Sequence, residues 1–453
     1  METSLPPRWR LLASLCLCLI AAPGRTQESV VVPDFGTPLL RDWVQAEYPA
    51  QAKTEKKEGT VAVEFIVEAD GSVTHEAVKK SSDPVFDAAA LAAVRQWKFK
   101  PGYDYGQPSP YAMQARVMFE LAQLQQKSAP IYPSSKQMPG PQKEIPAKPV
   151  TGIEPDYPAE LEPMKIPGEV HMEFTVNPEG RAEQPRVLWA SHPAFVETSL
   201  RAIERAVYTP AKQGPLSKRS LVKYPVGFES MGARPADILE ANHLVITTAA
   251  PVVLPRPQML IRAIYPRERL IAGEEGQAVV EFTLDEEGRP KEIVVLSADQ
   301  PEFGAALRAA VETWAFKPAR GDAGPMAVRV RATQAFSAAA GSADARLAAL
   351  LKPGGAGVSA PSGLDRALKP LWRGFPVYPA ALLEQGPTGQ AVVEFVIDRD
   401  GRARVPRIVS ATEEAFGWAA VTAISQWVFE RPTKGGEPVD IAVRIPVGFN
   451  APK

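Results

Sequence analysis

One pattern occurs four times in this chain, and it limits the possible folds more than any other feature of the sequence. Each copy starts with Tyr-Pro, carries a glycine eleven residues after the tyrosine, and carries a second glycine twelve residues later. A phenylalanine follows after fifteen more residues, with no insertion or deletion in any copy. Such regular spacing indicates tandem modules of one fold. The four pairs are Tyr48-Pro49, Tyr157-Pro158, Tyr265-Pro266 and Tyr378-Pro379.

The segment between the two glycines predicts a β-hairpin. Apolar residues alternate along it, as in a strand with one buried face. The second glycine, Gly71 in copy one, follows Asp70, and this pair is typical of a hairpin turn. The equivalent turn glycines are Gly180, Gly288 and Gly401, and the alternating apolar set of copy one is Val61, Val63, Phe65 and Val67.

Two helices and a last strand complete each copy. Tyr-Pro opens a short helix, because proline is tolerated at the first helical position, and we expect Gly59 to end it in the left-handed conformation. A second helix starts near Ser82, an N-cap type of residue, and has apolar residues at helical spacing as far as Trp97. The order α-β-β-α-β predicts an α+β fold of four tandem two-layer modules, each with a three-stranded antiparallel sheet. The residues equivalent to Ser82 are Ser191, Asp299 and Thr412.

Proline-rich stretches separate the copies, and the sequence has 46 prolines. Copy two is degenerate, because Ala206 stands where the other copies have tryptophan, which leaves a gap in the core unless Trp189 fills it. The predicted organisation is a signal peptide over residues 1–26, repeat 1 over 36–124, a Pro-rich linker over 125–146, repeat 2 over 147–230, repeat 3 over 251–338, a Gly/Ala/Pro linker over 339–362 and repeat 4 over 363–450.

The N-terminus predicts export. Arg8 and Arg10 precede an apolar stretch over residues 11–22, which is shorter than the roughly 20 residues needed to cross a bilayer. A cleaved secretory signal is the favoured interpretation, and retention as an anchor is the alternative. Both cysteines, Cys16 and Cys18, lie in this segment. The mature chain would therefore have no disulfide, thiolate metal site or cysteine nucleophile.

The repeated motif resembles the C-terminal domain of the TonB energy transducers. The resemblance implies a periplasmic, non-catalytic protein whose partner is a short receptor peptide added to a sheet edge. Transducers of that family keep a membrane anchor, so the resemblance supports peptide or protein binding more strongly than energy transduction. The motif in copy one is Tyr48-Pro49, Gly59, Val61, Val63, Phe65, Val67, Gly71, Ser81-Ser82, Phe86-Asp87, Ala89-Ala90-Leu91, Ala93-Val94, Trp97, Phe99 and Pro101.

The residues do not indicate an enzyme. None of the four histidines has metal-ligand spacing, and we expect His192 to lie on the surface. The run Gly354–Gly357 belongs to a linker and does not follow a strand as a phosphate loop does. A net charge of −1 gives no overall attraction to nucleic acid. We therefore expect no catalytic residue, no metal, no cofactor and no small-molecule substrate.

The expected partners are proteins or peptides, outer-membrane receptor segments among them, with membrane contact only if the signal stays uncleaved. We expect a periplasmic protein that is soluble after cleavage. Three hypotheses stay open: a periplasmic TonB-like binding protein in transmembrane transport, a membrane-anchored energy transducer, and a structural scaffold that is not energised. The mature N-terminus separates the first two, and peptide binding separates the first from the third.

Copies one and three are the predicted binding modules, because the last strands of the other copies contain Pro225 and Pro446. Proline removes a ladder donor and discourages strand addition at an edge. Arginines on the last strands of copies one and three would favour an acidic peptide. A glutamate recurs at one strand position, Glu64 in copy one, and we expect either a solvated face or a cross-strand pair with arginine there. The predicted partner-binding residues are Tyr48, Pro49, Arg116, Val117, Met118, Tyr265, Pro266, Arg329, Val330 and Arg331.

Overall fold

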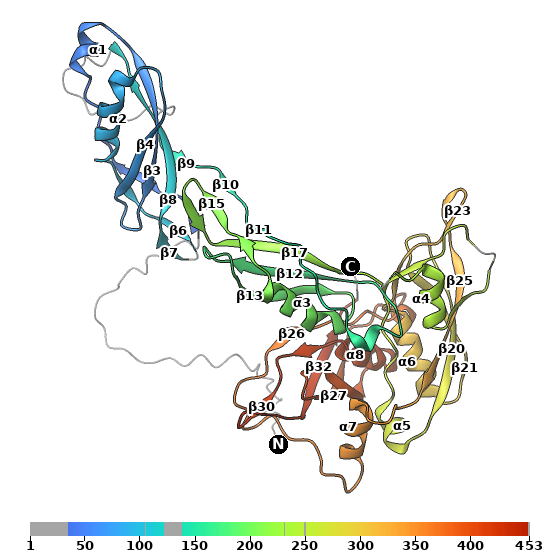
Figure 1. Cartoon of the computed structure of the whole chain (residues 1–453). Helices are drawn as coiled ribbons and strands as arrows, with labels where there is room; N and C mark the ends of the chain where they lie inside the picture. Colours follow the sequence, from blue (N-terminus) through green and yellow to red (C-terminus); the bar gives the residue numbers. More distant parts are fainter. Residues whose placement is uncertain (1–34, 105, 122–137, 231, 249–250, 452–453) are drawn as a thin grey trace, which may run out of the picture. The chain divides into compact units, whose positions relative to one another are not determined.

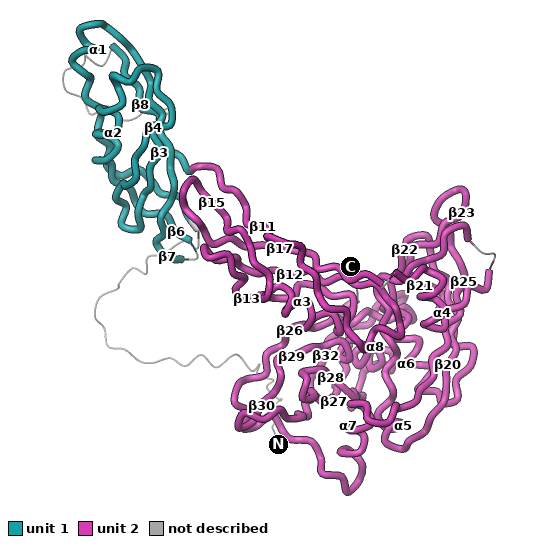
Figure 2. Tube along the Cα trace, viewed as in Figure 1, with its two compact units in different colours: residues 1–141 teal, residues 142–453 magenta. Residues whose placement is uncertain are grey.

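The computed structural model describes residues 35–104, 106–121, 138–230, 232–248 and 251–451. These residues belong to two compact units, residues 1–141 and 142–453 (Figure 2). The first unit holds repeat 1, and the second unit holds the other three repeats. The predicted signal peptide lies outside the described residues, and no helix within those residues has the length and apolar character to cross a membrane.

Repeat 1 is built around a long antiparallel hairpin (Figure 1). Its first strand, β3 (Gly59–Val67), lies between β4 (Val73–Ser81) and the final strand β8 (Tyr111–Phe119). The turn η1 (Pro84–Phe86) and helix α2 (Asp87–Val94) pack against this sheet, and α1 (Ala50–Thr54) precedes it. The short strands are β1 (Phe35–Gly36), β2 (Leu39–Asp42), β5 (Lys98–Lys100), β6 (Gly102–Asp104), β7 (Gln107–Ser109) and β9 (Gly140–Pro141).

The same plan recurs in the second unit. The central strands are β12 (Gly168–Val176), β20 (Gly276–Leu284) and β27 (Gly389–Ile397). Their hairpin partners are β13 (Ala182–Ala190), β21 (Pro290–Ala298) and β28 (Ala403–Ala411). The covering helices are α3 (Ala194–Arg205), α6 (Pro301–Val311) and α8 (Glu414–Ile424), and the final strands are β17 (Ser220–Phe228), β25 (Val328–Phe336) and β32 (Ile441–Phe449).

Further elements connect and flank these modules. The additional helices are η3 (Ala159–Leu161), α4 (Pro235–Ala241), α5 (Arg267–Ala272), α7 (Ala343–Leu351) and η4 (Ala380–Leu382). The short strands are β10 (Glu144–Ile145), β11 (Lys148–Pro149), β14 (Tyr208–Thr209), β15 (Ala211–Gln213), β16 (Leu216–Lys218), β18 (Leu244–Ile246), β19 (Arg256–Met259), β22 (Ala315–Lys317), β23 (Arg320–Gly321), β24 (Gly324–Pro325), β26 (Pro370–Trp372), β29 (Val428–Phe429), β30 (Thr433–Lys434) and β31 (Glu437–Pro438).

The prediction of four α+β modules is confirmed, and two details of it are wrong. The main sheet has three strands in repeats 2 and 4, but four in repeats 1 and 3, because β9 and β18 add to β8 and β25. The first helix exists as α1 and α5 in repeats 1 and 3. In repeats 2 and 4 it is only a 3-10 turn, η3 or η4, so this part of the module is not a full α-helix in every copy.

The glycine that starts each central strand has a packing role. Gly59 is part of β3 and does not have positive φ, so it is not the left-handed helix cap that its position predicts. A Cβ on Gly59 would lie 2.3 Å from a ring carbon of Phe86, so only glycine lets this ring approach the strand. The hairpin glycine Gly71 does have positive φ, at 83°, as the predicted turn requires.

The serine near the start of the second helix caps a strand. Ser82 Oγ accepts a hydrogen bond from the Thr60 backbone N–H at 2.9 Å, and the N-cap of η1 is Asp83. The helix-cap prediction for Ser82 is therefore wrong. The same bond joins Glu169 N–H to Ser191, Gln277 N–H to Asp299 and Gln390 N–H to Thr412. A short polar acceptor is needed here because each first strand begins with a backbone N–H to satisfy.

The two units differ in how their cores are built. The core of repeat 1 is a cluster of its own, whose buried members lie between Ala52 and Phe119. In the second unit, buried residues of repeats 2, 3 and 4 form one continuous cluster, and α6 contacts α8. Repeats 2, 3 and 4 therefore stabilise one another, whereas repeat 1 has a complete core by itself.

We expect residues 35–141 to fold when they are expressed alone, because their core needs no residue of the second unit. Circular dichroism should show native secondary structure and one cooperative thermal transition. Residues 142–230, which contain repeat 2 alone, are the matched control and should not unfold cooperatively, because their core continues into repeats 3 and 4. An unfolded 35–141 fragment would contradict the autonomy of repeat 1.

Candidate partner-binding site

The edge of the repeat 3 sheet is occupied by a strand of the same chain. Strand β18 pairs antiparallel with β25, with Leu244 opposite Ala332 and Ile246 opposite Val330. Leu244 is 4% exposed and belongs to the core of the second unit. The strand is therefore anchored by a buried side chain as well as by backbone hydrogen bonds.

The backbone hydrogen bonds at this edge show which backbone groups of β25 face outward. The Thr247 N–H donates to Arg329 O at 2.9 Å, and the Thr333 N–H donates to His243 O at 3.2 Å. The backbone N–H and C=O groups of Arg329 and Thr333 therefore point toward the added strand. Because these directions alternate along a strand, those of Arg331 point the same way. Val330 points its backbone groups toward β20.

Repeat 1 carries a shorter addition on the equivalent strand. Strand β9 pairs antiparallel with β8, where Gly140 lies opposite Gln114 and Pro141 opposite Met113. Pro141 is exposed and Gly140 half-buried, so β9 has no buried side chain that anchors it. This added strand is held less firmly than β18.

The final strands of repeats 2 and 4 accept no such strand in the part of the chain that the structure describes. Pro225 of β17 lies opposite His171, and Pro446 of β32 lies opposite Val392. The contact outside the β32 ladder is an isolated parallel bridge between Ser359 and Ile441. The two proline-containing strands thus differ from β8 and β25, to which strands of this chain do add.

The predicted tyrosines have a packing role. The ring of Tyr265 packs edge to face against Phe303 and Phe336, with centroids 5.8 and 5.9 Å apart, and Tyr48 is placed in the same way. The Tyr265 hydroxyl donates to Glu274 O at 2.8 Å, and the Tyr48 hydroxyl donates to Lys57 O. Pro49 and Pro266 are the N-caps of α1 and α5, one position before the first helical turn. Partner contact by these four residues stays a prediction.

The predicted residues on β8 and β25 divide into two kinds. Val117 and Val330 are 6% and 1% exposed, so their side chains belong to the cores. Arg331 and Arg329 lie 3.2 and 3.6 Å from the Glu281 carboxylate, which already neutralises part of their charge. Attraction of an acidic peptide by these two arginines is correspondingly weakened. Arg116 is exposed on β8, and Met118 lies two residues further along the same strand.

The recurring glutamate pairs across strands with arginine, one of its two predicted roles, in repeats 2, 3 and 4, and with lysine in repeat 1. Glu394 accepts from Arg407 at 3.0 Å and from Arg444 at 2.8 Å, on the two neighbouring strands. Burial alone would raise the pKa of Glu394, but hydrogen bonds from Arg407, Arg444 and Arg267 outweigh it and lower this pKa to about 2. The other copies pair Glu64 with Lys79, Glu173 with Arg186 and Glu281 with Arg331.

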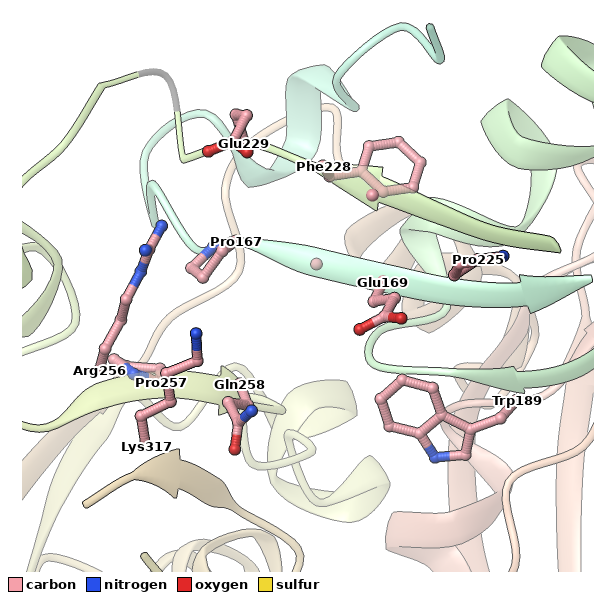
Figure 3. Close-up of a pocket in the computed structure, with 12 residues that line it drawn as sticks. Pro167, Glu169, Trp189, Pro225, Phe228, Glu229, Arg256, Pro257, Gln258 and Lys317 are labelled. Carbon is pink, nitrogen blue, oxygen red and sulfur yellow. The ribbon is translucent and has the colours of Figure 1, made fainter. Parts of the chain in front are cut away.

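A groove of about 420 Å³ lies within the second unit between the outer face of the repeat 2 sheet and the start of repeat 3 (Figure 3). Trp189 stands on one side with 37% of its surface exposed, and its ring centroid is 5.4 Å from that of His171. Arg256 and Lys317 stand on the other side, and neither has a carboxylate partner among the described residues. Glu169 also lines the groove and pairs with His171 at 2.9 Å.

The face of the sheet on which Trp189 lies could not be predicted from the alternation of apolar residues along the strand. A β-bulge places His171 opposite Trp189 and the adjacent Met172 opposite Val187, so one residue of β13 is skipped. Trp189 therefore points to the outer face and does not fill the gap beside Ala206, which the sequence left open. The bulge depends on strand pairing, and nothing in the local sequence marks it.

These modules match a known family. The model described as Gram-negative bacterial TonB protein C-terminal matches residues 44–121, 153–229, 262–337 and 375–451. The matches cover more than half of the chain, and the protein belongs to this family. The resemblance seen in the Tyr-Pro repeats is thereby confirmed, and the family is one of energy transducers for transport rather than of enzymes.

Two relatives illustrate the match. Protein TonB of Vibrio cholerae serotype O1 is 30% identical over 102 residues, which are 22% of this chain and 41% of that protein. The chain thus spans less than half the length of this curated relative. A solution NMR structure of the Pseudomonas aeruginosa TonB CTD is 27% identical, covering 22% of this chain and 97% of that chain with a TM-score of 0.18.

Proposed function

We propose that this protein acts in the periplasm in TonB-dependent transport, and that it binds extended segments of partner proteins, outer-membrane receptors among them, at the edges of its sheets. Family membership supports the transport context. One observation carries the binding mode: the two final strands without proline, β8 and β25, each pair with a further antiparallel strand of the chain.

Strand addition explains why the edges differ. An edge strand offers unpaired N–H and C=O groups, and an extended segment gains one backbone hydrogen bond after another along it. Proline in β17 and β32 removes one donor from this ladder. A partner segment would use outward-facing backbone groups of β8 or β25, as β9 and β18 do.

Repeat 1 is the module that we expect to bind a partner. Among the described residues, its added strand β9 pairs with two residues of β8, and neither residue of β9 has a buried side chain. In repeat 3, a partner would have to displace β18, whose Leu244 is buried. Each backbone hydrogen bond contributes about 0.5–1.5 kcal/mol net to stability. Replacement of the short strand β9 by a partner segment therefore costs less free energy than removal of β18 with its buried side chain.

The test uses the outward-facing backbone of Arg116. Arg116 lies opposite Ala62 of β3 just as Thr333 lies opposite Val279 of β20, and the Thr333 N–H faces the added strand. Arg116→Pro should therefore remove an edge donor without breaking the β3–β8 ladder. We expect it to weaken binding about tenfold, equal to about 1.4 kcal/mol, to the tightest binder in a panel of synthetic extended peptides from outer-membrane receptors, measured by fluorescence anisotropy.

Arg116→Ala is the matched control, because it removes the same side chain and keeps the N–H. Its affinity should stay within about threefold of the unchanged protein, since a rim charge contributes little. Equal loss in the two variants would assign binding to the side chain, and no loss in Arg116→Pro would contradict strand addition at repeat 1.

A further inference from the structure

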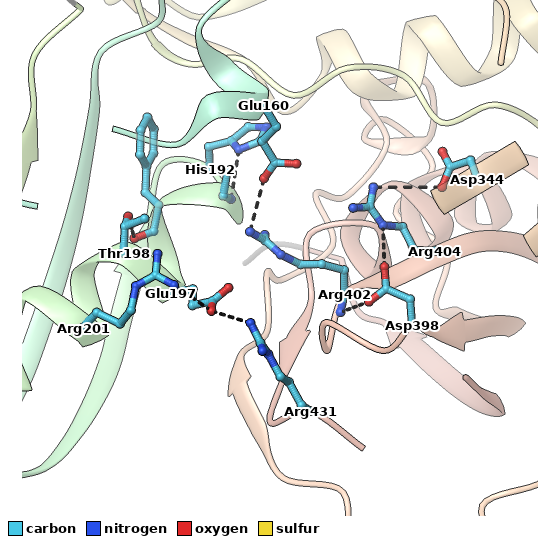
Figure 4. A network of polar contacts seen from close by, with 12 residues as sticks. Glu160, His192, Glu197, Thr198, Arg201, Asp344, Asp398, Arg402, Arg404 and Arg431 are labelled. Carbon is cyan, nitrogen blue, oxygen red and sulfur yellow. Dashed lines mark hydrogen bonds and ion pairs between the residues drawn. The ribbon is translucent and has the colours of Figure 1, made fainter. Parts of the chain in front are cut away.

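A cavity of about 310 Å³ lies where repeats 2, 3 and 4 meet inside the second unit. Figure 4 shows charged side chains of repeats 2 and 4 converging at this junction. His192, which we expected on the surface, is half-buried and lines the cavity. The polar residues used below that line the cavity are Glu160, His192, Arg262, Asp344, Arg402 and Arg404.

His192 offers one hydrogen-bond donor to the cavity. Its Nδ1 accepts from the Ala194 backbone N–H at 3.1 Å, so the ring proton is on Nε2. Burial, together with the nearby charges of Arg402, Arg262 and Arg404, lowers the pKa of His192 to about 3. The ring is therefore neutral at neutral pH, and three guanidinium groups are close enough to act on it.

Two of these arginines have unused donors. Arg402 has a side chain that is only 14% exposed, and its Nη2 donates to Glu160 Oε1 at 3.2 Å. Its Nε and Nη1 have no acceptor in the described ranges. Arg262 has no side-chain hydrogen bond or ion pair within the same residues. Arg262 is exposed, whereas Arg402 is half-buried. Guanidinium donors that are partly withdrawn from water are normally paired, so the unpaired donors of Arg402 favour an anionic ligand.

Among the charged residues that line the cavity, three are arginines, Arg262, Arg402 and Arg404, and two are carboxylates, Glu160 and Asp344. Asp398 is 1% exposed and is engaged by Arg404 Nε at 3.1 Å. Asp344 lies 4.0 Å from Arg404, and burial raises its pKa, which weakens it as a counter-charge. Glu160 is 48% exposed and accepts a hydrogen bond from Arg402. Positive charge therefore exceeds negative charge on the cavity wall, where Asp344 Oδ1 is a buried acceptor without a hydrogen-bond partner among the described residues.

We propose that this cavity binds a small multivalent anion whose oxygens are held by Arg262, Arg402 and the Nε2–H of His192. The donor set suits the oxygens of phosphate or of a compact di- or tricarboxylate, and the volume lies at the small end of ligand cavities. Because the donors come from three repeats, the bound anion would join repeats 2, 3 and 4. This ligand site is separate from the sheet edges proposed for peptides.

The experiment measures binding of sodium phosphate, sulfate and citrate to the full chain by calorimetry, and thermal unfolding in each salt against sodium chloride of equal ionic strength. We expect at least one anion to bind with one site per chain and to raise the midpoint of unfolding, as a ligand specific for the folded state must. Phosphate and sulfate together would indicate a tetrahedral oxyanion, and citrate alone a carboxylate ligand.

The Arg262→Gln variant should weaken this binding about tenfold or more, as expected for loss of a charge-assisted contact. Arg289→Gln is the matched control, since Arg289 is exposed at the β20–β21 turn and does not line the cavity. Circular dichroism should show both variants folded, because neither side chain is buried. No stabilisation beyond the chloride control, or equal weakening in both variants, would overturn the proposal.

Discussion

Replacement of Trp97 by alanine should lower the free energy of unfolding of repeat 1 by about 3–5 kcal/mol, the range for truncation of a buried large aromatic side chain. Trp97 is 2% exposed, and its ring packs edge to face on Phe65 with centroids 6.0 Å apart. Its Nε1–H donates to Val44 O at 2.8 Å. The substitution therefore creates a cavity and also leaves a carbonyl without its donor. Denaturant titration of the 35–141 fragment measures the change.

The same bond recurs in two other repeats, where Trp314 donates to Ile261 O and Trp427 to Gly374 O, both at 2.8 Å. The exposed Trp189 provides the control in the full chain: Trp189→Ala should change the free energy of unfolding by less than about 1 kcal/mol, because no enclosed cavity forms. A smaller loss for Trp314→Ala than for Trp189→Ala would contradict the packing role of the repeated tryptophan.

Loss of Arg267 should destabilise the junction of repeats 3 and 4 by about 3–5 kcal/mol, the cost of breaking a buried ion pair from one side. The side chain is 5% exposed and donates to Val405 O at 2.6 Å and to the Glu394 carboxylate at 2.7 Å. A third bond reaches Glu394 O at 2.9 Å. Arg267→Ala leaves these acceptors unpaired, and chemical denaturation of the full chain should show the second unit unfolding earlier.

Arg407→Ala is the matched control, because Arg407 donates to the same carboxylate at 3.0 Å but is 39% exposed. We expect this substitution to lower the free energy of unfolding by at most about 1 kcal/mol.

The pH dependence of stability gives an independent measure of the contribution of Glu394. The pKa of Glu394 is lowered from 4.5 to about 2 in the folded chain, so the unfolded chain binds more protons between these values.

The stabilisation by Glu394 is thus fully present above pH 4.5 and is lost as the pH falls toward 2. Glu394→Gln should flatten the pH dependence of stability in that window. If Arg267→Ala and Arg407→Ala destabilise the second unit equally, the buried contacts of Arg267 do not hold the junction.

Local spacing in the sequence predicted the repeated unit correctly. Alternation over Val61, Val63 and Phe65 predicted a strand with one buried face, and all three are at most 1% exposed. The turn at Gly71 and the packing of Trp97 also follow from short-range patterns. These features could be predicted because each depends on residues that are close in sequence or repeated in register.

Contacts between distant segments decided the rest. The sequence does not show that residues 244–246 add to β25, or that β9 adds to β8, because an edge strand can pair with any extended segment of suitable chemistry. The sequence therefore identified candidate residues on the edge strands. It could not predict which segments of the chain already pair with these strands, or which of their backbone groups face outward.

The sequence by itself determined the module, its fourfold repetition and the family to which the chain belongs. Only the tertiary structure showed that repeat 1 has its own core while repeats 2, 3 and 4 share one. It also brought His192, Arg262 and Arg402 to one cavity, although Arg402 lies on a different repeat from each of the others. Periodicity specifies which face of an element is buried, whereas the partner of that face depends on the packing of segments that are far apart in the chain.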